Sequence, residues 1–444
     1  MGEVNERSAV RRLYDRFGFG ATPEDLDQSF AGALDRLLTA PPGGDAPAPP
    51  DLPPPPRPEK GGKGEKGEKA DKRDPEFREA KKAANRERAA QQKELAAWWL
   101  DRMVAVDVAT TERVTWFWHG HFATSSQKVK VAALMQRQND TFRRLGQGSF
   151  TDLARALIVD PAMIVWLDGN DNKAGAANEN LSREYMELFA LGVGNYTEDD
   201  VREGARALTG WTVDRETGEA KLVPKRRDDE PATIFGEKAE YTAESFVDLL
   251  LSREESAAFV VGRMWYRLVS PTPPDDDARA RLLAAYGPKR DIRATLRAIA
   301  EEPAFRDEAT TLVKQPVEWL VGLLRALRLR PSALDEKLLG KVYKGLMGLG
   351  QVPFRPPSVG GWPSGASWLT TAAGITRLKL AETIMQQANL DSLAQSKDRV
   401  EGVRELLVVD SWSDRTRAAL GEVAADPAKV AALAACAPEY VVSG

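Results

Sequence analysis

The sequence predicts an all-α or nearly all-α protein, a multi-helix globular domain with one small β-hairpin. Apolar residues recur three and four positions apart in "LARALIVDPAMIVWL" (153–167) and "VEWLVGLLRALRL" (317–329), which is the spacing of a helix with one buried face. Helix start signals are frequent and strand signals are few. These observations together favour helices as the main element of the fold.

Two start signals and one turn signal place particular elements. Thr22-Pro23-Glu24-Asp25 puts a capping side chain before a proline and two acids, a combination suited to the first turn of a helix. Thr197-Glu198-Asp199-Asp200 repeats the arrangement without the proline, ahead of "VREGARALTGW". The stretch "WTVDRETGEAKLV" (211–223) predicts a hairpin that turns near Thr217-Gly218.

A low-complexity insertion divides the helical domain into residues 1–40 and 75–444. Residues 41–74 read "PPGGDAPAPPDLPPPPRPEKGGKGEKGEKADKRD" and offer almost no apolar side chain for a core, so they predict a disordered surface loop. Asp74-Pro75 then begins a long helix that becomes apolar from Leu95 onward. The charged first part of this helix is either a solvated face or an arm that binds a partner.

Composition excludes several classes of function. Hydrophobic residues make up 42% of the 444 residues, charged residues 29%, and the net charge is −4, which argues against nucleic acid as a partner. The first 20 residues lack the apolar core of a secretory signal, and no apolar run is long enough to span a membrane. We therefore expect a cytoplasmic protein without membrane segments. The single cysteine, Cys436, is expected to be a small buried residue.

Both histidines of the chain lie in "TERVTWFWHGHFATS" (111–125), directly after three aromatic residues. Residues two apart on a continuous helix point about 200° from each other, so His119 and His121 would not converge there. They can converge if the helix ends at His119 with Gly120 in a left-handed conformation, or if the stretch is extended, because residues two apart then share a face. A bend of that kind would bring both rings to one ion. The alternative is two buried rings whose nitrogen atoms are occupied by neighbours.

An acidic helix is the second candidate for chemistry. In "NENLSREYMELFALGVGNYTEDD" (178–200), Asn180 is expected to cap a helix over residues 181–191 that Gly192 ends. Glu184 and Glu187 are three apart and share one face. Glu179 lies just before the first turn. The alternative is a structural network in which arginines neutralise these acids, for which the candidates are Arg183, Arg202 and Arg206.

Two neutral imidazoles and one or two carboxylates form a ligand set suited to iron, manganese or zinc. The leading hypothesis is a metal-dependent enzyme in which His119, His121 and Glu184 bind the ion. Two histidines and one carboxylate leave open positions for dioxygen or substrate, so oxidative chemistry on non-haem iron is favoured slightly over hydrolysis on zinc or manganese. The candidate catalytic residues are Glu187, Glu179 and Arg183, where either glutamate is a further ligand or a general base.

Several segments resemble a known bacterial family. They are "DRFGFGATPEDL", "TWFWHGHFATSSQKV", "LVKQPVEWLVGLLRAL", "PSVGGWPSGASWLTTA" and the long run from Asp160 to Asp214. The chain is similar over nearly its whole length, the insertion apart, to the family catalogued as domain of unknown function 1800. The resemblance implies no established reaction. It implies a protein partner from a sulfatase-like family that is often encoded beside these proteins, and relatives often carry export signals.

The sequence departs from the family pattern at one place. Relatives commonly show a His-Asp pair after the "LTGW" segment, whereas the matching stretch here is "RRDDEPATIFG" (226–236). Asp228 or Asp229 stands where the resemblance implies a histidine. If that histidine is a ligand or a base in relatives, this chain has substituted a carboxylate as an outer metal ligand or has lost the activity.

The segment "GGWPSGASW" (360–368) supplies a candidate binding loop. Trp362 and Trp368 are expected to line a pocket and stack on a flat or sugar-like ligand, and Arg377 on the next helix is a candidate for binding an anionic group. The alternatives are a loop that fills the core and an arginine that forms an ion pair.

A helical scaffold that binds a partner protein, with a structural His/Glu/Arg network and no catalysis, is the alternative to an enzyme. The missing family histidine and the long charged helix favour it. Nucleotide, serine-hydrolase and iron–sulfur functions lack their motifs in this sequence, and a haem or flavin protein has only the aromatic residues in its favour.

Overall fold

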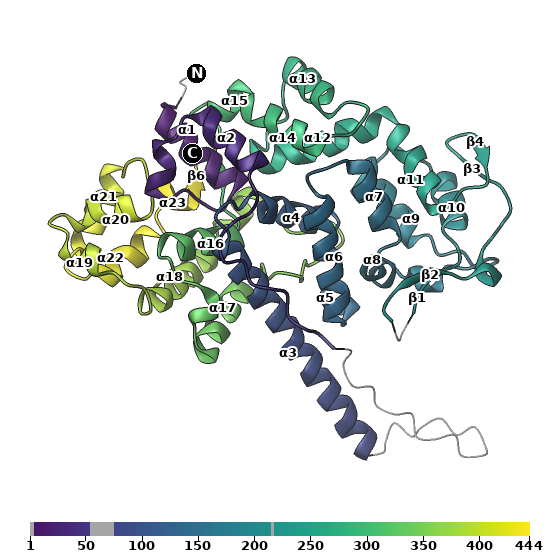
Figure 1. Cartoon of the computed structure of the whole chain (residues 1–444), viewed down its shortest axis with the longest axis horizontal. Coiled ribbons are helices and arrows are strands. Elements are labelled where there is room, and N and C mark those ends of the chain that lie inside the picture. The colour runs from purple at the N-terminus through teal and green to yellow at the C-terminus, as the bar shows by residue number, and fades with distance from the viewer. Residues whose placement is uncertain (1–3, 54–74, 215–216) are drawn as a thin grey trace.

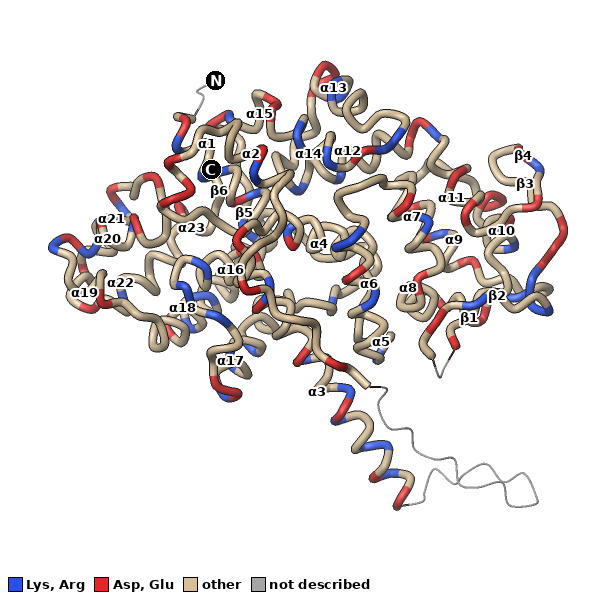
Figure 2. The backbone as a smooth tube through the Cα atoms, viewed as in Figure 1, with Lys and Arg blue, Asp and Glu red and all other residues tan. Residues whose placement is uncertain are grey.

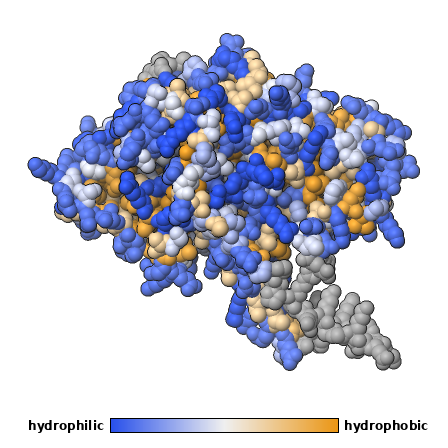
Figure 3. Space-filling view, in the orientation of Figure 1, coloured by the Kyte–Doolittle hydropathy of each residue, from blue (hydrophilic) through white to orange (hydrophobic). Residues whose placement is uncertain are grey.

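The structure is a computed structural model that describes residues 4–53, 75–214 and 217–444. It confirms the all-α fold prediction, because helices dominate the described chain and the strands form only two-stranded sheets (Figure 1). Within the described residues, no helix has an apolar stretch long enough to cross a bilayer. The face in Figure 3 is largely hydrophilic, with separate apolar patches.

One hydrophobic cluster, here named cluster A, fills the upper and right part of Figure 1. It is closed by helices with one apolar face each: α1 (Glu6–Phe17), α2 (Phe30–Thr39), α7 (Phe150–Ile158), α9 (Asn180–Glu184), α10 (Glu198–Ala207), α11 (Ala243–Ser252), α12 (Glu254–Leu268), α13 (Asp276–Tyr286), α14 (Ile292–Glu301) and α15 (Pro303–Arg306).

A second hydrophobic cluster, cluster B, fills the left and lower part of the view. Its helices are α3 (Pro75–Ala105), α5 (Ser126–Val129), α6 (Ala132–Leu145), α8 (Pro161–Trp166), α16 (Pro316–Ala326), α17 (Glu336–Gly348), α18 (Thr371–Met385), α19 (Asp391–Gln395), α20 (Arg399–Leu406), α21 (Asp414–Val423), α22 (Pro427–Ala434) and α23 (Pro438–Val441).

Helix α4 (Thr110–His121) lies between the two clusters. Its Val114 and Trp118 belong to cluster A, whereas Trp116 belongs to cluster B. Because both sides of α4 face apolar side chains, a polar group on this helix must find its hydrogen-bond partner inside the protein.

The predicted hairpin is present. Strand β1 (Trp211–Val213) pairs antiparallel with β2 (Ala220–Leu222), and Trp211 lies opposite Leu222. Gly218 in the turn has a φ of +69°, a conformation that favours glycine, while residues 215–216 lie outside the described residues. Two further pairs join β3 (Ala232–Ile234) to β4 (Glu237–Ala239) and β5 (Leu312–Val313) to β6 (Val442–Ser443).

The predicted capping signals are also present. At the start of α10, the amide of Asp200 donates to Thr197 Oγ1 at 3.2 Å, and the amide of Thr197 donates to the Asp200 carboxylate at 2.9 Å. The corresponding box at Thr22 and Asp25 begins only the short 3₁₀ helix η1 (Pro23–Asp27).

The prediction of disorder over residues 41–74 is wrong for its first part. Residues 41–53 form an extended segment that packs along α3, with Leu52 buried in cluster B. Proline has no amide hydrogen to satisfy, so a proline-rich segment is ordered once donors from other elements reach its carbonyl groups. Residues 54–74 lie outside the described residues.

The predicted long charged helix is present as α3, and the first half of its described range projects from the body with charges of both signs along it (Figure 2). Its last turns are fixed by Glu112 of α4, whose side chain is fully buried. The Glu112 carboxylate accepts bonds from Trp99 Nε1 at 2.8 Å and from Arg102 Nε and Arg143 Nε at 2.7 Å each. Burial alone would raise the pKa of Glu112, but the two arginines hold it below its usual value.

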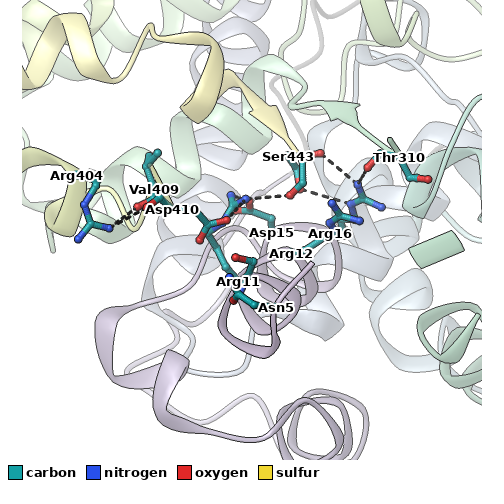
Figure 4. Close-up of polar contacts among 12 residues, drawn as sticks. Asn5, Arg11, Arg12, Asp15, Arg16, Thr310, Arg404, Val409, Asp410 and Ser443 are labelled. Atoms are coloured by element: carbon teal, nitrogen blue, oxygen red, sulfur yellow. Dashed lines mark hydrogen bonds and ion pairs between the residues drawn. The ribbon is translucent and has the colours of Figure 1, made fainter. Parts of the chain in front are cut away.

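Three arginines of α1 tie the first helix to distant segments (Figure 4). Arg11 pairs with Asp15 at 3.2 Å and with Asp410 at 2.9 Å, and Arg12 donates to the Phe305 carbonyl oxygen at 2.8 Å. Arg16 donates to the carbonyl oxygens of Thr310, at 2.8 Å, and of Ser443, at 3.2 Å. These bonds hold β6 and the loop before β5 against α1.

We expect Glu112→Ala to lower the free energy of unfolding by about 3–5 kcal/mol, because it removes one side of a buried ion cluster and leaves Arg102 and Arg143 without their acid. Glu179→Ala, which removes an acid from a partly exposed pair, is the matched control and should cost about 1 kcal/mol or less. Denaturant unfolding of both variants measures the difference, and equal losses would contradict the structural role of Glu112.

Candidate functional site

Gly120 does not bend the chain, so the predicted break in the helix is wrong. Helix α4 continues through Gly120 to His121, and Gly120 is not among the glycines with positive φ. The glycine that adopts the left-handed region is Gly361, whose φ is +82°. A Cβ atom on Gly361 would lie 2.3 Å from the Gly120 carbonyl oxygen, so the 360–365 loop approaches α4 at backbone distance. The two histidine rings therefore diverge, as the spacing of a regular helix requires.

His119 points into cluster B. Its ring centroid lies 5.3 Å from those of Phe354 and Trp362 and 5.4 Å from that of Trp99. Nε2 accepts the Phe354 amide hydrogen at 3.0 Å, and burial lowers the pKa of His119 to about 3. The ring is therefore neutral with its proton on Nδ1. The one lone pair that could bind a metal is already occupied by a backbone amide.

His121 points the other way, into cluster A, among Phe117, Phe122 and Phe259. Its Nε2 lies 2.9 Å from the carbonyl oxygen of Phe189, which can only accept, so Nε2 carries the proton. Burial, followed by the charge of Arg263, lowers the pKa of His121 to about 3. Nδ1 is buried and has no hydrogen-bond partner among the described residues.

The acidic helix differs from its prediction in shape. Asn180 is the first residue of α9 rather than its cap, and residues 185–190 continue it as a π-helix, η3 (Tyr185–Ala190), in which Leu191 donates to the Met186 carbonyl oxygen at 2.8 Å. Gly192 ends the segment with a φ of +86°, as predicted. Phe189 lies in the last turn, where carbonyl groups lack helical partners, so His121 satisfies one of them.

Arginines neutralise part of the acidic set, as the structural alternative proposed. Arg183 donates to Glu179 at 2.9 Å and to Glu198 at 2.7 Å. Glu187 accepts a short hydrogen bond from the Tyr196 hydroxyl. Burial and the neighbouring Glu187 charge raise the pKa of Glu184. None of these contacts involves either histidine.

The two aspartates that replace the family histidine also lie in ion pairs. Asp228 binds Arg206 Nε at 3.0 Å, and this contact lowers the pKa of Asp228. Asp229 is 80% exposed and pairs with Arg227 at 3.0 Å. Neither aspartate contacts a histidine or a glutamate of the candidate set.

The predicted donor set does not fit a metal ion in this arrangement. The histidines face opposite clusters, and the carboxylates of Glu179, Asp228 and Asp229 each face an arginine. Over the described residues, no three His, Cys, Asp or Glu side chains are close enough together to hold one ion. The structure therefore brings together none of the predicted metal ligands, and we derive no reaction step through a metal.

The predicted binding loop divides into two unconnected parts. Trp368 is buried in cluster B, and the Trp368 carbonyl oxygen accepts a bond from Arg377 Nη1 at 2.8 Å. Arg377 is only 2% exposed and lies over the ring of Trp319. Trp362, in contrast, is stacked on Trp116 with a centroid distance of 5.0 Å and lines a recess beside α4.

This recess, here named the aromatic arm, lies between α4, α12 and α14 and extends to the 360–365 loop. It is narrow, with space at its centre for little more than one or two water molecules. Its walls are mostly apolar and its polar groups are few, and the lining includes Phe17, Arg113, Trp116, Arg267, Gln315 and Trp362.

A second recess, the polar arm, continues from the first, because Arg113, Arg267 and Gln315 line both. Arg113 is neutralised by a short ion pair with Glu318, and Lys314 by Asp15 at 3.0 Å. Tyr266 and Ser364 form a short hydroxyl–hydroxyl hydrogen bond at this arm. The junction of the arms thus joins an aromatic space to a charged one.

Arg267 is the exception among these cations. Its Nη2 donates to the Trp362 carbonyl oxygen at 3.1 Å, whereas its buried Nη1 has no partner, and no acid lies within ion-pair distance of it in the described part of the chain. Trp362 Nε1 is a second buried donor without an acceptor. Burial, followed by the Arg263 charge, lowers the pKa of Arg267 to about 10, so the group stays positively charged at neutral pH.

Sequence reasoning missed Arg113 and Arg267 as members of a site. A signal was present in "VVGRMWYRLVS" (260–270), where two arginines four residues apart interrupt an apolar helix with no acid nearby in sequence.

Comparison with known proteins gives one match. A family model described as "Protein of unknown function (DUF1800)" matches residues 12–442, nearly the whole chain. No curated protein and no solved structure matches.

The first prediction from this geometry concerns acid stability. Both histidines have a pKa near 6.5 when unfolded and about 3 when folded, so their stabilising contribution is complete above pH 6.5 and is lost as the pH falls toward 3. Each histidine should lower the free energy of unfolding by about 2 kcal/mol at pH 5 relative to pH 7.5. We expect His119→Gln and His121→Gln each to remove about 2 kcal/mol from the difference in the free energy of unfolding between pH 5 and pH 7.5, as measured by denaturant unfolding. A loss of stability that is the same at both pH values would contradict the buried neutral state.

The second prediction uses the two glycines at the contact of α4 with the loop. Gly361→Ala should lower the free energy of unfolding by about 2 kcal/mol or more, because φ is positive and the added carbon meets the Gly120 carbonyl group. Gly120→Ala is the control and should raise stability by about 0.5–1 kcal/mol, because the added carbon makes only a 4.0 Å contact with Trp362 on a regular helix. Destabilisation by Gly120→Ala and not by Gly361→Ala would show that the bend lies at residue 120 after all.

Proposed function

Since the chain belongs to this family of proteins of unknown function, we propose its function from the geometry of the two-armed recess: the protein binds a small organic molecule through a carboxylate group at Arg267. The observation that carries the proposal is the pair of buried donors without acceptors, Arg267 Nη1 and Trp362 Nε1. A buried donor that lacks a partner costs free energy, and a bound acceptor removes that cost.

The charged side chains that line the recess favour an anionic ligand. Among the cations that line it, Arg113 and Lys314 each face an acid, whereas Arg16 and Arg267 form no ion pair within the described residues. Arg16 donates to backbone carbonyl oxygens, whereas Arg267 keeps a buried donor without an acceptor. A carboxylate would supply the missing negative charge and accept charge-assisted hydrogen bonds from the guanidinium.

The shape of the aromatic arm favours a planar ligand group. The aromatic arm is narrow and its walls include the stacked rings of Trp116 and Trp362. A carboxylate is flat and enters between such walls more readily than a tetrahedral phosphate or sulfate does. Because the centre of the arm has space for little more than one or two water molecules, an aromatic body attached to the acid would lie where the arm opens to solvent and contact the apolar walls there.

The motif histidines support the proposal in a structural role. His119 contacts Trp362 and His121 stays neutral in cluster A, so neither adds a titrating charge beside the recess above about pH 4. They hold α4, which forms one wall of the recess, against both clusters.

The partner-binding scaffold is the second candidate function. The projecting first half of α3 and the structural contacts of the motif residues favour it. The sulfatase-like neighbour remains a proposed partner, and co-purification of the two proteins after truncation of α3 between residues 75 and 90 is the direct test.

Titration calorimetry with benzoate and benzamide tests the carboxylate site. We expect benzoate to bind the wild type and benzamide, which lacks the charge, to bind at least tenfold more weakly. Arg267→Met should weaken benzoate binding at least tenfold, because a hydrogen bond to a charged group contributes about 1.5–3 kcal/mol.

Arg155→Met is the matched control, because Arg155 pairs with Asp248 on the surface away from the recess and its loss should leave binding unchanged. Equal binding of benzoate and benzamide, or unchanged benzoate binding by Arg267→Met, would contradict the proposal. Tighter binding of sulfate than of benzoate would show that the site selects a tetrahedral anion.

A further inference from the structure

A proline-rich segment of this chain lies in a groove between α3 and α6, a feature independent of the recess. The carbonyl oxygens of Pro47, Pro50 and Pro53 each accept a hydrogen bond from a side chain of these helices. The donors are Trp98 Nε1 at 3.2 Å, Gln136 Nε2 at 2.8 Å and Gln91 Nε2 at 2.9 Å. The bonded carbonyl groups are three residues apart.

A spacing of three is the period of a polyproline II helix, which has three residues per turn and no hydrogen bonds of its own. Solvent exposure does not repeat every three residues, because Pro49 and Pro53 are exposed as well as Ala48 and Asp51. Leu52, in contrast, is 6% exposed and anchors the segment in cluster B.

The donor side chains are aligned along the segment and form what is here named the recognition track. Gln91, Trp98 and Arg102 lie at spacings of seven and four on α3 and so share one face, and Arg102 Nη1 also reaches the Pro47 carbonyl oxygen at 3.3 Å. Gln136 extends from α6 to the middle of the segment. Aromatic and amide donors aimed at proline carbonyl groups are the means by which proteins recognise polyproline II segments.

We propose that the groove between α3 and α6 is a polyproline II binding site, which the chain fills with its own residues 46–53 and which takes a proline-rich segment of another protein when its own segment leaves. Because the hydrogen bonds go to backbone carbonyl groups, the groove requires the extended conformation and an apolar residue at the position of Leu52, and it tolerates other residues at the positions of Ala48 and Asp51. The tethered segment competes with an added one through its high local concentration.

The test uses a full-length variant in which residues 46–53 are replaced by glycine and serine, and a peptide with the sequence of residues 45–53 as the probe. We expect saturable binding of the peptide to this variant by calorimetry, and binding at least tenfold weaker to the wild type, whose own segment occupies the groove. Leu52→Asp in the peptide should abolish binding.

Two glutamine substitutions in the emptied variant separate the groove from the rest of the surface. Gln136→Ala should weaken peptide binding at least fivefold, whereas Gln387→Ala, at an exposed position after α18, should leave it unchanged. No binding by the folded, emptied variant would overturn the proposal.

If the emptied variant does not fold, limited proteolysis of otherwise wild-type chains gives the answer. The double variant Gln91→Ala, Gln136→Ala should be cleaved near Leu52 at least tenfold faster than Gln387→Ala, because two of the bonds that hold the segment are lost. Equal cleavage rates would overturn the assignment of these side chains as the recognition track.

Discussion

The structure depends on the burial of α4 between two hydrophobic clusters. A helix with apolar neighbours on both sides has no water for its polar groups, so each must be matched within the protein. Glu112 binds two arginines and a tryptophan, Arg113 binds Glu318, His119 accepts a backbone amide, and His121 donates to a backbone carbonyl group. The contacts of these four residues connect α4 to α3, α6, α16, the 352–355 segment and η3, and so they position most of the remaining fold.

The same constraint changes the interpretation of the family motifs. The His-Gly-His segment alone is typical of a metal chelate, but each ring packs into a different hydrophobic cluster. The glycine between them lies where the 360–365 loop approaches the helix backbone. Arg267 is informative because, within the described chain, it is buried without a paired acid and its Nη1 has no acceptor. A buried donor without an acceptor beside an unpaired charge at a recess is the feature that a bound anion would satisfy.

The sequence predicted the structural features that depend on the backbone preferences of neighbouring residues. The capping box at Thr197, the hairpin at Gly218 and the stop at Gly192 all follow from the backbone preferences of a few residues. The features that the sequence did not predict depend on interactions between distant segments. Gly120 stays helical because α4 is packed on both sides, and residues 41–53 are ordered because donors from positions 91, 98 and 136 reach them. Neither fact is visible in a local pattern, and the missing acid beside Arg267 is visible only once the helices are assembled.

Nitrogen-15 NMR of the histidine rings tests the central claim most directly, because the chain contains only two histidines. From pH 4.5 to 8, we expect two neutral rings of opposite tautomer, His119 protonated on Nδ1 and His121 protonated on Nε2, with shifts that do not change when zinc is added. Titration of either ring near pH 6.5, or a zinc-dependent shift of both rings together, would contradict the account and return the two histidines to the role of metal ligands.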